Sequence, residues 1–310
     1  MIYGNGKYSY ELVEGWAKLP EGESFNDVCS IAIDRLDRVF ILNRSEHPVK
    51  VFDSEGNFLS FWGENYFGRA HGACISSDDF IFCTDDKHHV VTKFDTKGNI
   101  SMVLGTKDAP SDTGYCQTSD LFESIASIKR GGPPFNRPTG VDLSSSGEIY
   151  ISDGYGNARV HKFSPDGNLL LSWGEPGPGS GQFRLPHSVR VDNKNQIWVT
   201  DRENSRIQIF DERGRFLNQL IDLIRPTDLC FHENLVYVSE LCKRVSIFTE
   251  NGVLLSRWGN ETHSATNPLF VAPHSIAVDS RGNIYVGEVA TTYVKVNRGS
   301  RTIQKFIRVR

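Results

Sequence analysis

One stretch decides the fold of this chain, RPTGVDLSSSGEIYISDGYGNARVHKFSPDGNLLLSWG, which runs from Arg137 to Gly174. Within it, four short runs of apolar and β-branched residues are separated by turns rich in Ser, Gly, Asp and Pro. Alternation with a period of two, interrupted by such turn residues, is typical of antiparallel β-strands joined by hairpins. The stretch therefore predicts a sheet of four short strands.

The same pattern occurs six times along the 310 residues, in copies that begin at Cys29, His71, Arg137, Arg184, Arg225 and Ala272. Repeated four-stranded units of about 40 residues indicate a β-propeller, in which each sheet packs between its neighbours around a central channel. We predict an all-β fold, a six-bladed β-propeller that forms a single domain over residues 1–310. The segment YELVEGWAKL, residues 10–19, is expected to complete the last blade.

One segment, residues 107–136, does not follow the repeat. Its content of Gly, Pro, Ser and Asp predicts a loop. We interpret it as an insertion between blades two and three that covers one end of the channel.

Composition and charge exclude several classes of partner. The chain has 34 Lys and Arg against 38 Asp and Glu, a net charge of -4, and so lacks the basic surface that nucleic acid or an anionic membrane would need. The N-terminal residues do not resemble a secretory signal, and no apolar run is long enough to cross a bilayer. Six scattered cysteines without CxxC pairs favour buried thiols, and we expect a cytoplasmic protein.

Each copy has an equivalent position at the start of its first strand, occupied in chain order by Cys29, His71, Thr139, His187, Thr227 and His274. The three histidines fall in alternate blades, about 120° apart around a six-bladed ring, on the strand that lines the channel. Three imidazoles with an open fourth position are typical of catalytic zinc. The competing explanation is structural, because Pro is common at the first residue of a strand and precedes two of the histidines. The alternation favours a metal site, and we expect the other six histidines at surface positions.

The loops between second and third strands should lie at the same end of the channel as these histidines. They contain Tyr155, Arg202 and Arg44. Two guanidinium groups can bind a carboxylate, and a phenol beside them, with an ordinary pKa of about 10, can act as a base once that pKa is lowered. The motifs of serine hydrolases, phosphate-binding loops, HExxH metalloproteases and dinucleotide-binding folds are absent.

The six copies resemble NHL repeats. In addition, the stretches LPHSV, VTDRENSRIQIF, ISDGYGNARVHKFSPDG and APHSIAVDSRGNIYVGE resemble the peptidyl-alpha-hydroxyglycine alpha-amidating lyase family over nearly the whole chain. The resemblance implies zinc bound by His71, His187 and His274, a catalytic role for Tyr155, and a substrate carboxylate held by Arg202 and Arg44. Other divalent transition metals can bind such a site.

The implied reaction is cleavage of the N–C bond of a carbinolamide, a peptidyl or small-molecule alpha-hydroxyglycine, to an amide and glyoxylate. Three positions depart from the family pattern: Ala272 replaces a Met, Ser275 replaces an Asp that helps to bind calcium, and Gly156 replaces a disulfide cysteine. The change at Ser275 argues against a structural calcium ion.

Two further interpretations remain open at this point. A metal-dependent hydrolase, of lactonase or esterase type, could use the same three histidines. A non-catalytic NHL interaction module is the other, although the net negative charge and the alternating histidines argue against it.

Overall fold

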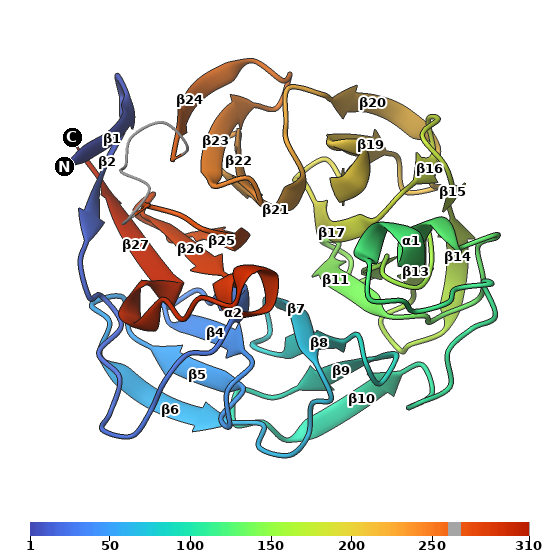
Figure 1. Ribbon diagram of the computed structural model, residues 1–310, viewed down its shortest axis with the longest axis horizontal. Helices are drawn as coiled ribbons and strands as arrows, with labels where there is room; N and C mark the ends of the chain where they lie inside the picture. Colours follow the sequence, from blue (N-terminus) through green and yellow to red (C-terminus); the bar gives the residue numbers. More distant parts are fainter. Residues whose placement is uncertain (260–267, 310) are drawn as a thin grey trace. The chain divides into compact units, whose positions relative to one another are not determined.

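The computed structural model describes residues 1–259 and 268–309, and over these residues the chain is the predicted six-bladed β-propeller (Figure 1). Each blade is an antiparallel sheet of at least four strands. The described residues contain two α-helices, both short: α1 (Leu121–Ala126) and α2 (Ala290–Val294). None of these helices is both long and apolar enough to span a membrane.

The chain forms two compact units, and we call them the middle unit, Asn65–Pro226, and the terminal unit, Met1–Glu64 with Thr227–Arg310. That the whole chain is a single domain stays a prediction.

The middle unit contains blades two, three and four. Blade two consists of β7 (Ala70–Ile75), β8 (Ile81–Asp85), β9 (Val90–Phe94) and β10 (Ile100–Leu104). Blade three consists of β11 (Pro138–Leu143), β12 (Ile149–Asp153), β13 (Arg159–Phe163) and β14 (Leu169–Trp173). Blade four consists of β17 (Pro186–Val191), β18 (Ile197–Asp201), β19 (Arg206–Phe210) and β20 (Phe216–Leu220). Between blades three and four lie the short parallel pair β15 (Glu175–Pro176) and β16 (Gln182–Phe183), and the 3-10 helix η1 (Arg202–Asn204) follows β18.

The terminal unit contains blades one, five and six. Blade one consists of β3 (Val28–Ile33), β4 (Val39–Asn43), β5 (Val49–Phe52) and β6 (Phe58–Trp62). Blade five consists of β21 (Pro226–His232), β22 (Leu235–Glu240), β23 (Arg244–Thr249) and β24 (Leu254–Trp258). Blade six consists of β25 (Pro273–Val278), β26 (Ile284–Glu288), β27 (Ile303–Arg308), β2 (Tyr8–Val13) and β1 (Ile2–Asn5), with the 3-10 helix η2 (Gly299–Thr302) before β27.

The N-terminal segment completes blade six, as the repeat predicts. Strand β2 pairs antiparallel with β27, Tyr10 opposite Arg308 and Val13 opposite Lys305. The strand ends at Val13, earlier than the predicted segment, because the chain turns at Gly15, whose φ of 61° is accessible to glycine at little cost. An additional strand, β1, pairs with β2 and was not predicted.

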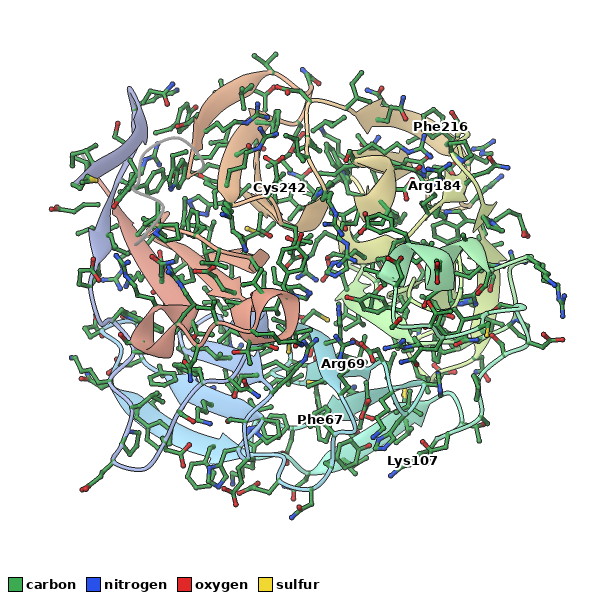
Figure 2. All side chains as sticks on the ribbon, in the orientation of Figure 1. Phe67, Arg69, Lys107, Arg184, Phe216 and Cys242 are labelled. Atoms are coloured by element: carbon green, nitrogen blue, oxygen red, sulfur yellow. The ribbon has the colours of Figure 1, made fainter. Side chains whose placement is uncertain are left out.

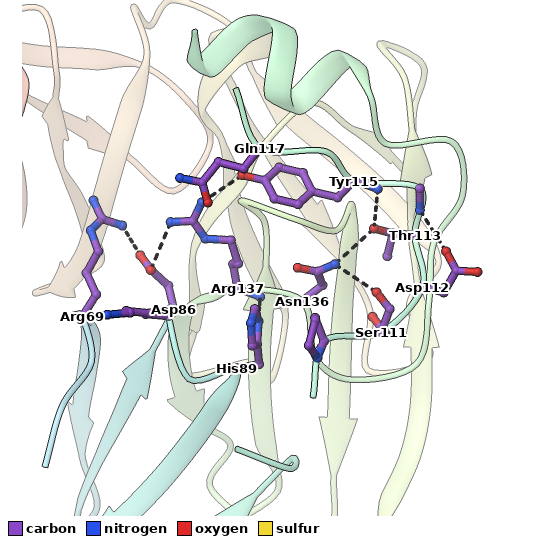
Figure 3. A pocket seen from close by; sticks show the side chains of 13 residues that line it. Arg69, Asp86, His89, Ser111, Asp112, Thr113, Tyr115, Gln117, Asn136 and Arg137 are labelled. Carbon is purple, nitrogen blue, oxygen red and sulfur yellow. Dashed lines mark hydrogen bonds and ion pairs between the residues drawn. The ribbon is translucent and has the colours of Figure 1, made fainter. Parts of the chain in front are cut away.

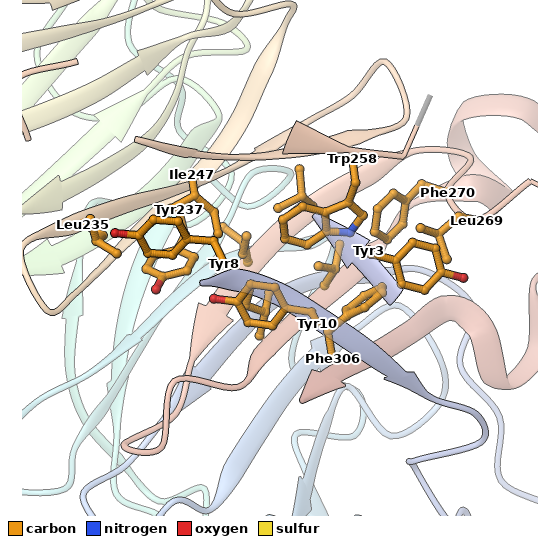
Figure 4. Close-up of a cluster of buried hydrophobic side chains, with 14 residues drawn as sticks. Tyr3, Tyr8, Tyr10, Leu235, Tyr237, Ile247, Trp258, Leu269, Phe270 and Phe306 are labelled. Carbon is orange, nitrogen blue, oxygen red and sulfur yellow. The ribbon is translucent and has the colours of Figure 1, made fainter. Parts of the chain in front are cut away.

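Apolar side chains fill the space between neighbouring blades within each unit. In the terminal unit, Tyr10 of blade six stacks on Trp258 of blade five with ring centroids 5.4 Å apart, and Phe306 lies fully buried beside them (Figure 4). The inner strands are buried almost throughout, since a blade packs on both faces, whereas the outermost, fourth strands are largely exposed to solvent. Phe216 on β20, 37% exposed, marks such a fourth strand (Figure 2).

Candidate active site

The six equivalent positions all fall at the start of the first strand of their blades and all are buried: Cys29, His71, Thr139, His187, Thr227 and His274. At four of these positions, His71, Thr139, Thr227 and His274, the side chain bonds a backbone carbonyl of the following blade. Thr139 donates its hydroxyl to the Pro186 carbonyl at 2.7 Å, and Thr227 donates to the Pro273 carbonyl at 3.1 Å. At these four positions the side chain therefore helps to join neighbouring blades, and in His71 and His274 the second ring nitrogen, Nε2, is not used for this contact.

An acidic side chain at the end of the second strand fixes the backbone just before this position. Asp85 accepts the Arg69 N–H at 2.9 Å, Asp201 accepts the Arg184 N–H at 2.9 Å, and Glu288 accepts the Ala272 N–H at 2.8 Å. All three carboxyl groups are fully buried or nearly so, and burial raises the pKa of Asp201 and of Glu288. The repeated acid is thus the local reason why the first-strand residues are held in place.

His71, His187 and Tyr155 lie together in the middle unit. The two imidazole rings are 4.8 Å apart between centroids, and the Tyr155 hydroxyl lies 3.2 Å from Nε2 of His71 and 3.5 Å from Nε2 of His187. Nδ1 of His71 is 2.7 Å from the Thr139 carbonyl, an acceptor only, so this nitrogen carries the proton. Nε2 is then left with a lone pair suited to a metal ion.

His274 has the same local arrangement in the terminal unit. Its Nδ1 lies 2.9 Å from the Cys29 carbonyl, so that in the neutral ring Nδ1 carries the proton and Nε2 the lone pair. The side chain is 3% exposed. The predicted ligands His71 and His274 therefore share one tautomer, imposed by the same backbone contact.

Arg202 lies beside Tyr155, as predicted. Its Nη1 is 3.4 Å from the Tyr155 hydroxyl, and its Nε donates to Glu203 at 2.8 Å. Burial opposes ionisation of Glu203, but the Arg202 and Arg225 guanidinium groups outweigh it and lower the pKa of that carboxyl below its ordinary value. The ionised Glu203 holds Arg202 against the phenol.

Arg44 belongs to the terminal unit, where its Nη1 contacts Asp27 at 3.4 Å and Thr292 at 3.2 Å. Its predicted role in holding a substrate carboxylate stays a prediction.

Two further arginines, which sequence reasoning missed, also contact Tyr155. The guanidinium carbons of Arg69 and Arg137 lie 5.5 and 5.2 Å from the centre of the phenol ring, compared with 5.6 Å for Arg202. The repeat contains a signal for them, because each occurs two residues before the equivalent first-strand position of its blade. Both arginines thus lie immediately before the first residue of their strands, β7 and β11.

The inserted segment covers Tyr155 within the middle unit. Leu121 and Ile125 of α1 pack with Tyr155 and Leu185. The prediction of a loop throughout was wrong for α1, because the Asp120 side chain accepts the N–H groups of Phe122 and Glu123 and so begins a helix.

The other histidines do not all lie at the surface, as was predicted for them. His161 is fully buried on β13, where it contacts Asp153 and Ser172, so its prediction as a surface residue was wrong. A third strand of a blade is covered on both faces, which is why alternation misled here. His263 lies outside the described residues.

Comparison with known proteins agrees with this architecture. A family model of the NHL repeat matches residues 135–163 and 183–210. Virginiamycin B lyase from Staphylococcus aureus has a similar structure, with a TM-score of 0.62 and 15% identity over 97% of this chain and all of that one. A gluconolactonase from Xanthomonas campestris also has a similar structure, with a TM-score of 0.61 and 11% sequence identity over 99% of this chain and 97% of that one. At such low identity these two show the fold alone.

The fold and the repeats define a protein of the NHL-repeat propeller class. Human NHL repeat-containing protein 3 is 31% identical over 319 residues, which cover 97% of this chain and 85% of the human protein. The chain belongs to the family of NHL repeat-containing protein 3. It is also homologous to peptidyl-alpha-hydroxyglycine alpha-amidating lyase 1 of Drosophila melanogaster, with 29% identity over 255 residues that cover 74% of this chain and 44% of that protein.

Proposed function

We propose that the protein is a zinc-dependent lyase that cleaves the N–C bond of a carbinolamide, a peptidyl or small-molecule alpha-hydroxyglycine, to an amide and glyoxylate. The observation that carries the proposal is the placement of the Tyr155 hydroxyl, 3.2 Å from His71 Nε2 and 3.4 Å from an Arg202 nitrogen. Homology to the Drosophila amidating lyase supports the same reaction.

His71 and His187 of the middle unit, together with His274 of the terminal unit, would hold the metal ion. The donor set fits zinc because all three are buried imidazoles, and His71 and His274 direct Nδ1 to a backbone carbonyl, which leaves Nε2 as the ligand atom. Zinc would act as a Lewis acid toward the substrate hydroxyl. Other divalent transition metals suit the same nitrogens.

The residues of the chain then have distinct tasks. Tyr155, as phenolate among three guanidinium groups, takes the proton of the substrate hydroxyl, the C–O bond becomes a carbonyl, and the C–N bond breaks. The phenol returns the proton to the departing amide nitrogen, so that the products are a neutral amide and glyoxylate. Arg202 binds the substrate carboxylate and fixes the carbinol carbon beside the phenol.

The test is glyoxylate release from alpha-hydroxyhippurate by the zinc-supplied protein. We expect Tyr155→Phe to lower kcat about 100-fold or more, because a general base contributes on that order. Tyr66→Phe is the matched control, since that hydroxyl contacts Thr92 and not the histidines. Undiminished activity in Tyr155→Phe would remove the assigned role of the phenol.

A hydrolase of lactonase type is the second candidate, supported by the gluconolactonase that shares the fold. The same imidazoles could hold a metal ion that activates water. A panel of lactones and small esters, assayed with the same zinc-supplied protein, separates the two reactions. The cytoplasmic location and the exclusion of nucleic-acid and membrane partners stay predictions.

A further inference from the structure

A cavity of about 870 Å³ lies in the middle unit between the inserted segment and the starts of blades two and three (Figure 3). Residues 110–115 and Gln117 of the insertion form one wall. Arg69 and Arg137 form the opposite wall and are the same two arginines that contact the Tyr155 ring. The same two side chains thus line the cavity and contact the phenol ring.

The wall formed by the arginines has a surplus of positive charge. Both guanidinium groups share one fully buried carboxylate, Asp86, and Arg137 also donates to the Tyr115 hydroxyl at 2.8 Å. Lys87 adds an exposed ammonium group to the lining. The other acid of the lining, Asp112, is already paired with Arg130 at the exposed edge. Two guanidiniums and one ammonium thus face one buried carboxylate, which favours an anionic ligand.

Arg137 is held in a backbone conformation that an arginine rarely adopts. Its φ is 65°, in the left-handed region that favours glycine. Nδ1 of His89 accepts the Arg137 N–H at 3.1 Å, and burial lowers the pKa of His89, which keeps that nitrogen able to accept. Arg225, at the equivalent position of blade five, has a φ of 50°, so this backbone conformation belongs to the repeat and fixes where the Arg137 side chain begins.

The insertion contributes hydrogen-bonding groups to the same cavity. Ser111 has a buried hydroxyl for which the described residues provide no hydrogen-bond partner. Buried polar atoms are seldom left unpaired, so this hydroxyl suits a polar ligand atom in the cavity.

We propose that this cavity binds the acyl part of the carbinolamide and that Arg69 and Arg137 select an acyl group bearing a carboxylate. The inference rests on the proposed lyase function and names its substrate class. The substrate would be a diacid, with one carboxylate on the carbinol carbon next to Arg202 and a second one at the far end of the acyl chain. Asp86 is a positioning residue that sets the two guanidinium groups side by side.

A matched pair of substrates tests this selection: N-succinyl-alpha-hydroxyglycine and its near-isostere N-succinamoyl-alpha-hydroxyglycine, in which a neutral amide replaces only the terminal carboxylate. We expect the wild-type kcat/KM to favour the succinyl compound about tenfold or more, because a charge-assisted contact is lost with the amide. In Arg137→Met the ratio should fall toward one. Arg159→Met, which removes a guanidinium paired with Glu175 outside the cavity, should leave the ratio unchanged. Equal rates in the wild type, or an unchanged ratio in Arg137→Met, would overturn the proposal.

A binding measurement separates this inference from the lyase reaction. N-succinylglycine and N-succinamoylglycine lack the hydroxyl and cannot be cleaved, so calorimetry reports their affinity alone. Tighter binding of N-succinylglycine, weakened in Arg137→Met, supports the anion site even if no carbinolamide is cleaved. Lys87→Met is a second variant at an exposed position that does not endanger the fold, and about a twofold to threefold loss of affinity is expected from its weaker, solvent-screened charge. Equal affinity of the two compounds in wild type overturns the inference.

Discussion

The hydroxyl of Tyr155 lies 3.2 Å from Nε2 of His71, although the two residues are 84 positions apart in the chain. His71 is the second residue of the first strand of blade two, and Tyr155 follows the second strand of blade three. The contact therefore depends on packing of neighbouring blades, and it places the proposed ligand nitrogen beside the proposed proton acceptor. This relationship is the basis of the proposed chemistry.

Loss of one imidazole should abolish metal binding. We expect the wild-type protein, supplied with zinc, to hold about one ion per chain, and His71→Ala to hold far less, because a three-histidine site loses a third of its ligands. Mass spectrometry of the metal content, on protein purified without an affinity tag, measures this. His232→Ala, in a side chain that contacts Glu233 at 3.9 Å, is the control. Full occupancy in His71→Ala would contradict the assigned ligand set.

The buried acid at the end of a second strand should be important for stability. Asp201 accepts the N–H groups of Arg184 and Leu185 and contacts Asn204 and Arg206, so Asp201→Ala leaves several buried donors unpaired. We expect a loss of about 3 kcal/mol or more in the free energy of unfolding, measured in urea. Asp211→Ala, in an exposed turn, should cost much less. Equal losses in the two variants would show that the repeated acid has no special role.

Much of this architecture could be predicted because it repeats. Six copies of a four-stranded repeat predicted six blades, and the equivalent first-strand positions identified His71, His187 and His274 as candidate metal ligands. The loop after the second strand identified Tyr155 and Arg202, which do lie together. Each of these depends on the local pattern within one blade.

The remainder depends on contacts that the repeat does not encode. Arg69 and Arg137 precede the first strands, and only the packing of blade two on blade three brings both to Tyr155. Helix α1 begins through the side-chain cap of Asp120, which a composition-based assignment of loop overlooks. The burial of His161 follows from a third strand that is covered on both faces.

Apolar packing between blades should dominate the stability of the terminal unit. Phe306 on β27 is fully buried against Trp258 and Phe270, so we expect Phe306→Ala to lower the free energy of unfolding by about 3–5 kcal/mol. Phe216, 37% exposed on β20, provides the matched control, and Phe216→Ala should cost less than about half as much. Thermal and urea unfolding measure both variants, and similar losses would contradict the burial argument.

Glu203 should make stability fall in acid. Because the pKa of its carboxyl lies below the ordinary value of 4.5 in the folded chain, the ionised form is favoured by folding. Its contribution is thus present above the unfolded pKa and is lost as the pH falls through the folded pKa, below 4.5.

Glu203→Gln tests this dependence, because the amide cannot ionise and its contacts with Arg202 and Arg225 lose their charge. We expect the variant to have a lower Tm than the wild type at pH 7 and a smaller decrease in Tm between pH 6 and pH 4, on the order of a few degrees. Glu212→Gln changes a side chain outside this cluster and should keep the wild-type pH dependence. If Glu203→Gln retains the full decrease in acid, another carboxyl group is responsible, and the orientation of Arg202 does not depend on the charge of Glu203.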